Sequence, residues 1–184
     1  MKTLLGGLGL FLLIHMLPQV RPLRYWLRLR IGNERYLAFF SFFTLIALML
    51  VGIGYSQTEV QLLWQRPQWT SLLTLVLMPF SLALILAAFQ RCNLKRLTLH
   101  PMMWGISLWA LAHLISNGSQ RSLILFGTLG CFALYKQWVL RRRWPELKFA
   151  RAPLWRDLSL ALQALLLTYL MLQIHPWLFG VAAL

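Results

Sequence analysis

Histidine is the residue type in this sequence best suited to chemistry inside a membrane. The chain has 184 residues and four histidines, each within or at the end of a long uncharged run: His15, His100, His113 and His175. A neutral imidazole in such a place packs as a core residue, relays protons or ligates a metal. The residue type alone leaves all three interpretations open.

Other catalytic chemistry has little support in the sequence. Proton pumps and ion-coupled transporters usually carry carboxylates inside their spans, whereas here the acidic residues fall in predicted loops or at predicted helix ends. These residues are Glu34, Glu59, Glu146 and Asp157. Cys92 and Cys131 are predicted to pack as small hydrophobic residues. No zinc-protease, P-loop or dinucleotide-binding motif occurs.

The composition indicates the elements that must position the histidines. Hydrophobic residues make up 59% of the chain and charged residues only 12%, with a mean hydropathy of +0.65. A soluble domain has roughly 45–50% apolar and about 25% charged residues. This excess of apolar residues excludes a soluble enzyme, a disulfide scaffold and a disordered chain. We therefore expect this chain to be an integral membrane protein, surrounded by a lipid bilayer.

Uncharged runs mark the predicted membrane helices, because a spanning helix needs about 20 apolar residues. The runs are Thr3–Val20, Leu37–Gly54, Pro67–Gln90, Leu97–Gln120, Ser122–Tyr135 and Leu158–Leu184. Lys136 is expected to snorkel and so extend the fifth run to Leu140. The first run is expected to be a mature helix, not a cleaved signal peptide. The sequence thus predicts an all-α polytopic membrane bundle of six transmembrane helices, forming one domain over residues 1–184.

The basic residues predict the orientation, because cytoplasmic loops carry the excess of lysine and arginine. Fifteen of the eighteen basic residues lie in the connections 21–36, 90–101 and 136–157, and the other three are Lys2, Arg66 and Arg121. Both termini are therefore predicted to be periplasmic, in a bacterial inner membrane. The net charge of +14 is then explained by the basic cytoplasmic connections, and nucleic acid is not an expected partner.

Helix rise brings two histidines to a similar predicted depth. His15 lies about 18 Å along an inward-running first helix, and His113 lies about 19 Å along an outward-running fourth helix, counted from His100. Both positions fall near the middle of the bilayer. His100 is expected at the cytoplasmic end and His175 near the periplasmic rim, where an anchoring role is favoured.

Haem b is the cofactor that such a pair of imidazoles suits. Asn117 follows His113 by four residues and is expected to hydrogen-bond its free ring nitrogen. Arg24 is expected to pair with a haem propionate, as are Arg21 and Arg96. The small residues Gly6, Gly7, Gly9, Gly105, Ala110 and Ala112 would leave room for the ring or, alternatively, allow close helix packing.

A single haem is favoured over two stacked haems. His100 and His113 are 13 residues apart, which is about 220° of helical rotation, so the two side chains point in different directions. Pro101 also marks a helix start, which places His100 near the cap. His100 is therefore the less favoured metal ligand.

Two stretches resemble the signature of the NnrU family. Residues 100–118 read HPMMWGISLWALAHLISNG, and the opening carries GLF at 9–11, His15, RPLR at 21–24 and IGNERY at 31–36. The similarity covers most of the chain. NnrU-like proteins are associated with nitrite and nitric oxide reduction in denitrifying bacteria. The family is similar to plant zeta-carotene isomerase, a membrane haem b enzyme that isomerises a central cis double bond.

The resemblance places the isomerase's haem ligands on His15 and His113, and His100 matches a further family histidine. Two positions depart from the pattern. Ala110 stands where the plant enzyme has a cysteine proposed as an alternative ligand, so a ligand exchange of that kind is not available. Ser119 follows Asn-Gly where many family members have aspartate.

Three functions therefore remain open. The first is a haem-binding protein of nitrite and nitric oxide metabolism, with respiratory membrane proteins as partners. The second is a cis-trans isomerase with a lipophilic, carotenoid-like polyene as substrate. The third is a structural or assembly protein without a cofactor.

Overall fold

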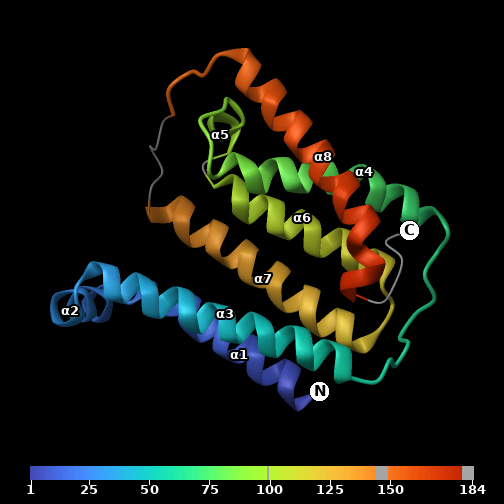
Figure 1. Ribbon diagram of the computed structural model, residues 1–184, viewed down its shortest axis with the longest axis horizontal. Coiled ribbons are helices and arrows are strands. Elements are labelled where there is room, and N and C mark those ends of the chain that lie inside the picture. The colour runs from blue at the N-terminus through green and yellow to red at the C-terminus, as the bar shows by residue number, and fades with distance from the viewer. Residues whose placement is uncertain (99, 144–148, 180–184) are drawn as a thin grey trace. The chain divides into compact units, whose positions relative to one another are not determined.

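The computed structural model describes residues 1–98, 100–143 and 149–179, and almost all ordered structure in them is helical (Figure 1). The chain divides into two compact units, Met1–Gln61 and Leu62–Leu184. The all-α prediction is confirmed for the described residues. Glu146, one of the four acidic residues, lies outside them. The single domain stays a prediction.

The first unit is built on two helices packed along each other. Helix α1 (Lys2–Met16) is followed by a short 3-10 turn, Leu17–Gln19, and then by α2 (Arg21–Ile31) and α3 (Asn33–Gln57). Pro18 and Pro22 stand second in the 3-10 turn and in α2, where the main-chain N–H has no partner within the helix. Gly32, with φ of +82°, makes the turn from α2 into α3.

Two glycines bring α1 and α3 into backbone contact. A Cβ added at Gly7 would lie 2.7 Å from the Val51 nitrogen, and one added at Gly54 would lie 2.6 Å from the Leu4 Cα. Leu4 and Ala47 are fully buried beside them. This pairing depends on small residues, as expected where the surrounding lipid gives little hydrophobic drive for association.

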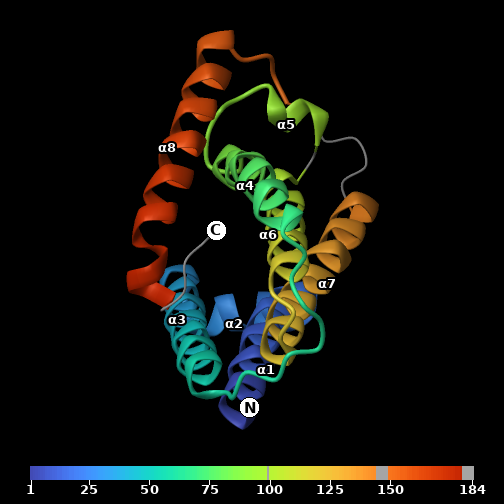
Figure 2. The same cartoon turned by 90° about the vertical axis from the view of Figure 1, so that its right-hand side faces the viewer.

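The second unit is a row of helices rather than a closed ring. It contains α4 (Trp69–Ala87), the single turn α5 (Leu94–Leu97), α6 (Pro101–Ser116), α7 (Gln120–Arg143) and α8 (Leu154–Phe179). Helix α4 packs against both α6 and α8, and α6 packs against α7, so the order across the unit is α8, α4, α6, α7 (Figure 2).

Small polar side chains join α4 to α6. Ser81 donates a hydrogen bond of 2.8 Å to the Gly105 carbonyl, at the point where a Cβ on Gly105 would meet the Ser81 main chain. One end of the pair is joined by a hydrogen bond between Thr74 and Ser116. Such bonds satisfy buried hydroxyls and hold the two helices in register.

Asn93, which immediately precedes α5, ties the start of that turn to the start of α8. Its side-chain nitrogen donates to the Ala152 carbonyl at 2.7 Å and to the Asp157 carboxylate at 2.6 Å. Its side-chain oxygen accepts from the Ala152 N–H at 2.9 Å, and its own N–H donates to Asp157 at 2.8 Å. A single amide thus crosslinks segments about 60 residues apart.

Replacing Asn93 with alanine is expected to lower the free energy of unfolding by about 2–4 kcal/mol, because three side-chain hydrogen bonds are lost, one of them to a charged group. Gln90→Ala is the matched control. It removes an exposed amide pair that links the segment after α4 to Gln163 of α8, and it should cost less than about 1 kcal/mol. Thermal unfolding in detergent measures both. Equal losses of stability in the two variants would show that the Asn93 hydrogen bonds contribute no more than an exposed amide pair.

Five described helices are long and apolar enough to cross a membrane: α1 with its 3-10 extension, α3, α4, α7 and α8. Helix α6 is apolar but has 16 residues, about 24 Å of helix against a hydrocarbon core of about 30 Å. The multi-pass prediction is therefore supported by five helices, and a sixth crossing is not established. The fifth run does extend through Lys136, because α7 continues to Arg143.

The connection 21–36 differs most from what the charge pattern indicated. Its arginines predict a loop, but eleven of its residues form α2 and the last four begin α3. Arg21, Arg24, Arg28 and Arg30 interrupt any spanning run, and they are compatible with a short helix because arginine is a good helix former. The three acidic residues in the described part lie where expected: Glu34 and Asp157 in first turns, and Glu59 between helices.

Candidate functional site

His15 lies in the last turn of α1, between two aromatic rings. Its Nδ1 donates a hydrogen bond of 2.9 Å to the Phe11 carbonyl, four residues earlier. The Phe11 ring stacks on the imidazole with centroids 4.0 Å apart, and the Phe40 ring from α3 meets it edge-on at 5.1 Å. These contacts hold the imidazole in one orientation.

His113 has the same arrangement in the second unit. It lies in the last turn of α6, and its Nδ1 donates a hydrogen bond of 2.9 Å to the Trp109 carbonyl, again four residues earlier. The Trp109 ring lies 5.0 Å away and the Phe126 ring from α7 lies 4.6 Å away. Each histidine is thus enclosed by one aromatic residue of its own helix and one from its packing partner.

This shared arrangement fixes which ring nitrogen can bind a metal. A carbonyl oxygen accepts only from an N–H, so Nδ1 carries the proton in both rings and Nε2 carries the lone pair. A metal-ligating histidine typically donates its other N–H to a carbonyl or carboxylate in this way. Both side chains therefore have the chemistry of a haem-iron ligand, a role in which histidine is common.

Asn117 does not make the expected bond to the His113 ring. Its side-chain nitrogen donates instead to the main-chain carbonyl of His113, at 3.0 Å. The ring nitrogen expected to be free is held by Trp109. The orienting contact is therefore within α6 itself, and Asn117 caps the helix end, where carbonyls lack partners.

His100 precedes α6 and has an unmet hydrogen-bonding requirement. Its ring lies against the main chain of Leu140 at the end of α7. Its Nε2 is buried without a hydrogen-bond partner, as are both side-chain polar atoms of Gln137. Buried polar atoms of this kind usually indicate an additional partner such as water or a ligand. From the sequence, His100 is a less favoured ligand than His15 and His113. No feature of the sequence indicates that its Nε2 is buried.

His175 lies on α8, close enough to His113 for the two imidazoles to interact electrostatically. The structure therefore brings His113 and His175 near each other within the second unit. His15 belongs to the first unit, and its meeting with His113 stays a prediction. Helix α8 packs on α4, and no spacing in the sequence connects His175 with α6.

The remaining predicted site residues divide between open surface and close packing. The Arg24 side chain is exposed on α2. Gly6 and Gly9 have open space where a side chain would stand. Packing accounts for the other small residues: Gly7 against α3, Gly105 against α4, Ala110 facing Gly130 of α7, and fully buried Ala112.

No cluster of three or more histidine, cysteine or acidic side chains occurs in the described part of the chain. A bare metal ion, which needs several protein ligands, therefore has no assembled site there. A haem needs fewer, because its ring supplies four nitrogens.

Only Trp109 among the four aromatic neighbours was expected on the same helix face as its histidine. Phe11 has the same spacing, four positions before His15, and this spacing could have indicated it. Phe40 and Phe126 come from other helices, and no spacing in the sequence connects them with His15 or His113.

Comparison with known proteins gives one match. The family described as NnrU protein matches residues 3–183, nearly the whole chain. No curated protein and no solved structure matches.

Proposed function

Because the chain belongs to the NnrU family, we propose that it is a haem b-binding membrane protein acting in nitrite and nitric oxide metabolism. The observation that carries the haem proposal is the repeated arrangement at His15 and His113. In each, Nδ1 is tied to a carbonyl four residues earlier and the imidazole lies between two aromatic rings. The carbonyl contact leaves Nε2 as the nitrogen with the lone pair in both residues, as in a metal-ligating histidine.

The proposal gives each site residue a role. His15 and His113 would bind the iron through Nε2, and Arg24 would pair with a propionate. The aromatic neighbours hold the two rings in place and keep water away from Nε2. When bound, the haem would supply a redox-active iron in an apolar environment, and the surrounding groups would set its potential.

Six membrane crossings with both termini in the periplasm complete this proposal. Helix α6 would be the sixth crossing, shortened to 16 residues. The basic α2, the α5 turn and the arginines that end α7 would then lie on the cytoplasmic side. The proposed location is a bacterial inner membrane, because it suits both this topology and the metabolic role. Cysteine-accessibility labelling at Lys2 and Arg142 tests the topology, because the two sites should react from opposite faces.

Purification from haem-replete cells tests the cofactor proposal. We expect about one haem b per chain, seen as a Soret band and quantified as the pyridine haemochrome. Well-folded protein that repeatedly purifies without haem would contradict it and favour a cofactor-free structural or assembly role.

A deletion strain tests the metabolic proposal. We expect slower nitrite or nitric oxide consumption without the gene, restored by the wild type. Expression in a strain that accumulates cis-carotenes tests the isomerase alternative. Conversion of those pigments, with unchanged nitrite consumption in the deletion strain, would favour that alternative.

A further inference from the structure

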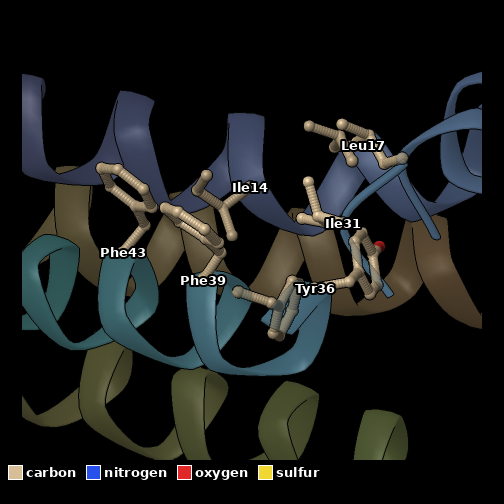
Figure 3. A pocket seen from close by; sticks show the side chains of 8 residues that line it. Ile14, Leu17, Ile31, Tyr36, Phe39 and Phe43 are labelled. Carbon is tan, nitrogen blue, oxygen red and sulfur yellow. The ribbon is translucent and has the colours of Figure 1, made fainter. Parts of the chain in front are cut away.

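The first unit contains an apolar pocket beside α2. Its volume is about 360 Å³, roughly a dozen times the ~30 Å³ share of a water molecule in the liquid. Aliphatic and aromatic side chains from every helix of the unit line it (Figure 3): Ile14, Leu17, Leu27, Ile31, Phe39 and Phe43. Such a lining suits a hydrocarbon chain.

Two hydrogen-bond donors without partners are found here, one on a residue that lines the pocket and one on a residue that contacts it. Tyr36, which also lines it, is 6% exposed, and its hydroxyl is buried with no partner. Figure 3 shows that hydroxyl on the side of Ile31 and Leu17. Arg28 of α2 lies with its guanidinium carbon 5.2 Å from the Tyr36 ring centroid, and its Nε is also buried without a partner. Leaving both donors unsatisfied would be costly, so an acceptor is expected.

The charge around these donors selects the kind of acceptor. Helix α2 carries four arginines and no acidic residue, so an anion is favoured over a neutral carbonyl. A purely hydrocarbon ligand would fill the pocket but leave Tyr36 and Arg28 unpaired. The ligand therefore needs an apolar chain and an anionic oxygen head.

Helix α2 also has the character of a helix at the membrane surface. Tyr25, Trp26 and Leu29 are each more than half exposed, alongside the arginines. Aromatic and basic residues of this kind are typical of helices at the headgroup level. At that level the available anionic, chain-bearing molecules are phospholipids.

We propose that the first unit holds one anionic phospholipid, with its phosphate on Arg28 and Tyr36 and an acyl chain in the pocket. The site does not depend on bound haem. It would distinguish lipids by charge, because a zwitterionic headgroup brings an ammonium group among the arginines of α2.

Native mass spectrometry of the delipidated full-length protein, titrated with phosphatidylglycerol or phosphatidylethanolamine, tests this site. We expect one tightly bound phosphatidylglycerol, retained about tenfold better than phosphatidylethanolamine. Arg28→Gln should weaken its binding about tenfold, because a charge-assisted bond is lost, and Tyr36→Phe should weaken it severalfold.

Arg30→Gln is the matched control. Arg30 lies two residues further along α2, about 200° around the helix, with its guanidinium over Trp26. The charge change is the same, but binding should stay within about twofold. Equal losses in Arg28→Gln and Arg30→Gln would reduce the effect to general surface attraction and overturn the site.

Two further experiments test the acyl chain and the phosphate headgroup separately. Ile31→Trp fills the pocket and should expel the lipid although Arg28 is intact. Inorganic phosphate should compete weakly, because it brings no acyl chain. Full competition by phosphate, or equal binding of the two lipids, would contradict the proposal. Circular dichroism identifies any variant that fails to fold, in which case Arg28→Lys, expected to retain partial binding, replaces Arg28→Gln.

Discussion

His113→Ala is expected to lower the haem b content of the purified protein by more than about tenfold. The substitution removes a nitrogen that would bond directly to iron, and even changes in outer-sphere partners cost about 10–100-fold in metal affinity. Alanine is a strong helix former, so α6 should persist although the imidazole contacts with Trp109 and Phe126 are lost. The Soret band per chain, measured with the thermal stability, gives the result.

The other histidines provide matched controls. His15→Ala should lower haem content similarly, or leave a weakly held haem with an altered Soret band, because one axial ligand remains. His175→Ala removes the imidazole near His113 and should retain haem. Loss of haem in His175→Ala but not in His15→Ala would contradict the predicted pair and place both ligands in the second unit. Retention of haem in His113→Ala would overturn the role of His113.

Gly54→Ala is expected to destabilise the first unit strongly. The added Cβ would lie 2.6 Å from the Leu4 Cα and 2.8 Å from the Thr3 carbonyl carbon. These are main-chain atoms, which cannot rotate away, so α1 must shift from α3. Overpacking of this kind typically costs about 1–3 kcal/mol, and contact with a backbone belongs at the upper end.

Gly52→Ala is the control on the same helix. It has open space around the added Cβ, and alanine is a better helix former than glycine by up to about 1 kcal/mol. We therefore expect an unchanged or slightly higher melting temperature for Gly52→Ala and a clear decrease for Gly54→Ala. Similar melting temperatures would show that α1 and α3 do not depend on their close approach.

The sequence by itself determined the membrane character, the helical class and the approximate position of each long helix. The physical reason is that lipid requires long uncharged helices, and charges end them visibly. It also selected His15 and His113 as a candidate pair, because helix rise along each uncharged run predicts a similar depth for the two. Helix lengths were less certain: α6 is shorter than its uncharged run, since Pro101 begins it and Asn117 ends it.

Only the tertiary structure decided which residues meet across helices. It placed Phe40 beside His15 and Phe126 beside His113, and it moved the orienting bond of His113 from Asn117 to Trp109. It also enclosed Tyr36 with Arg28 beside an apolar pocket. These pairings depend on the register and rotation of neighbouring helices, which many small contacts fix together, whereas the periodicity of one segment records only its own faces.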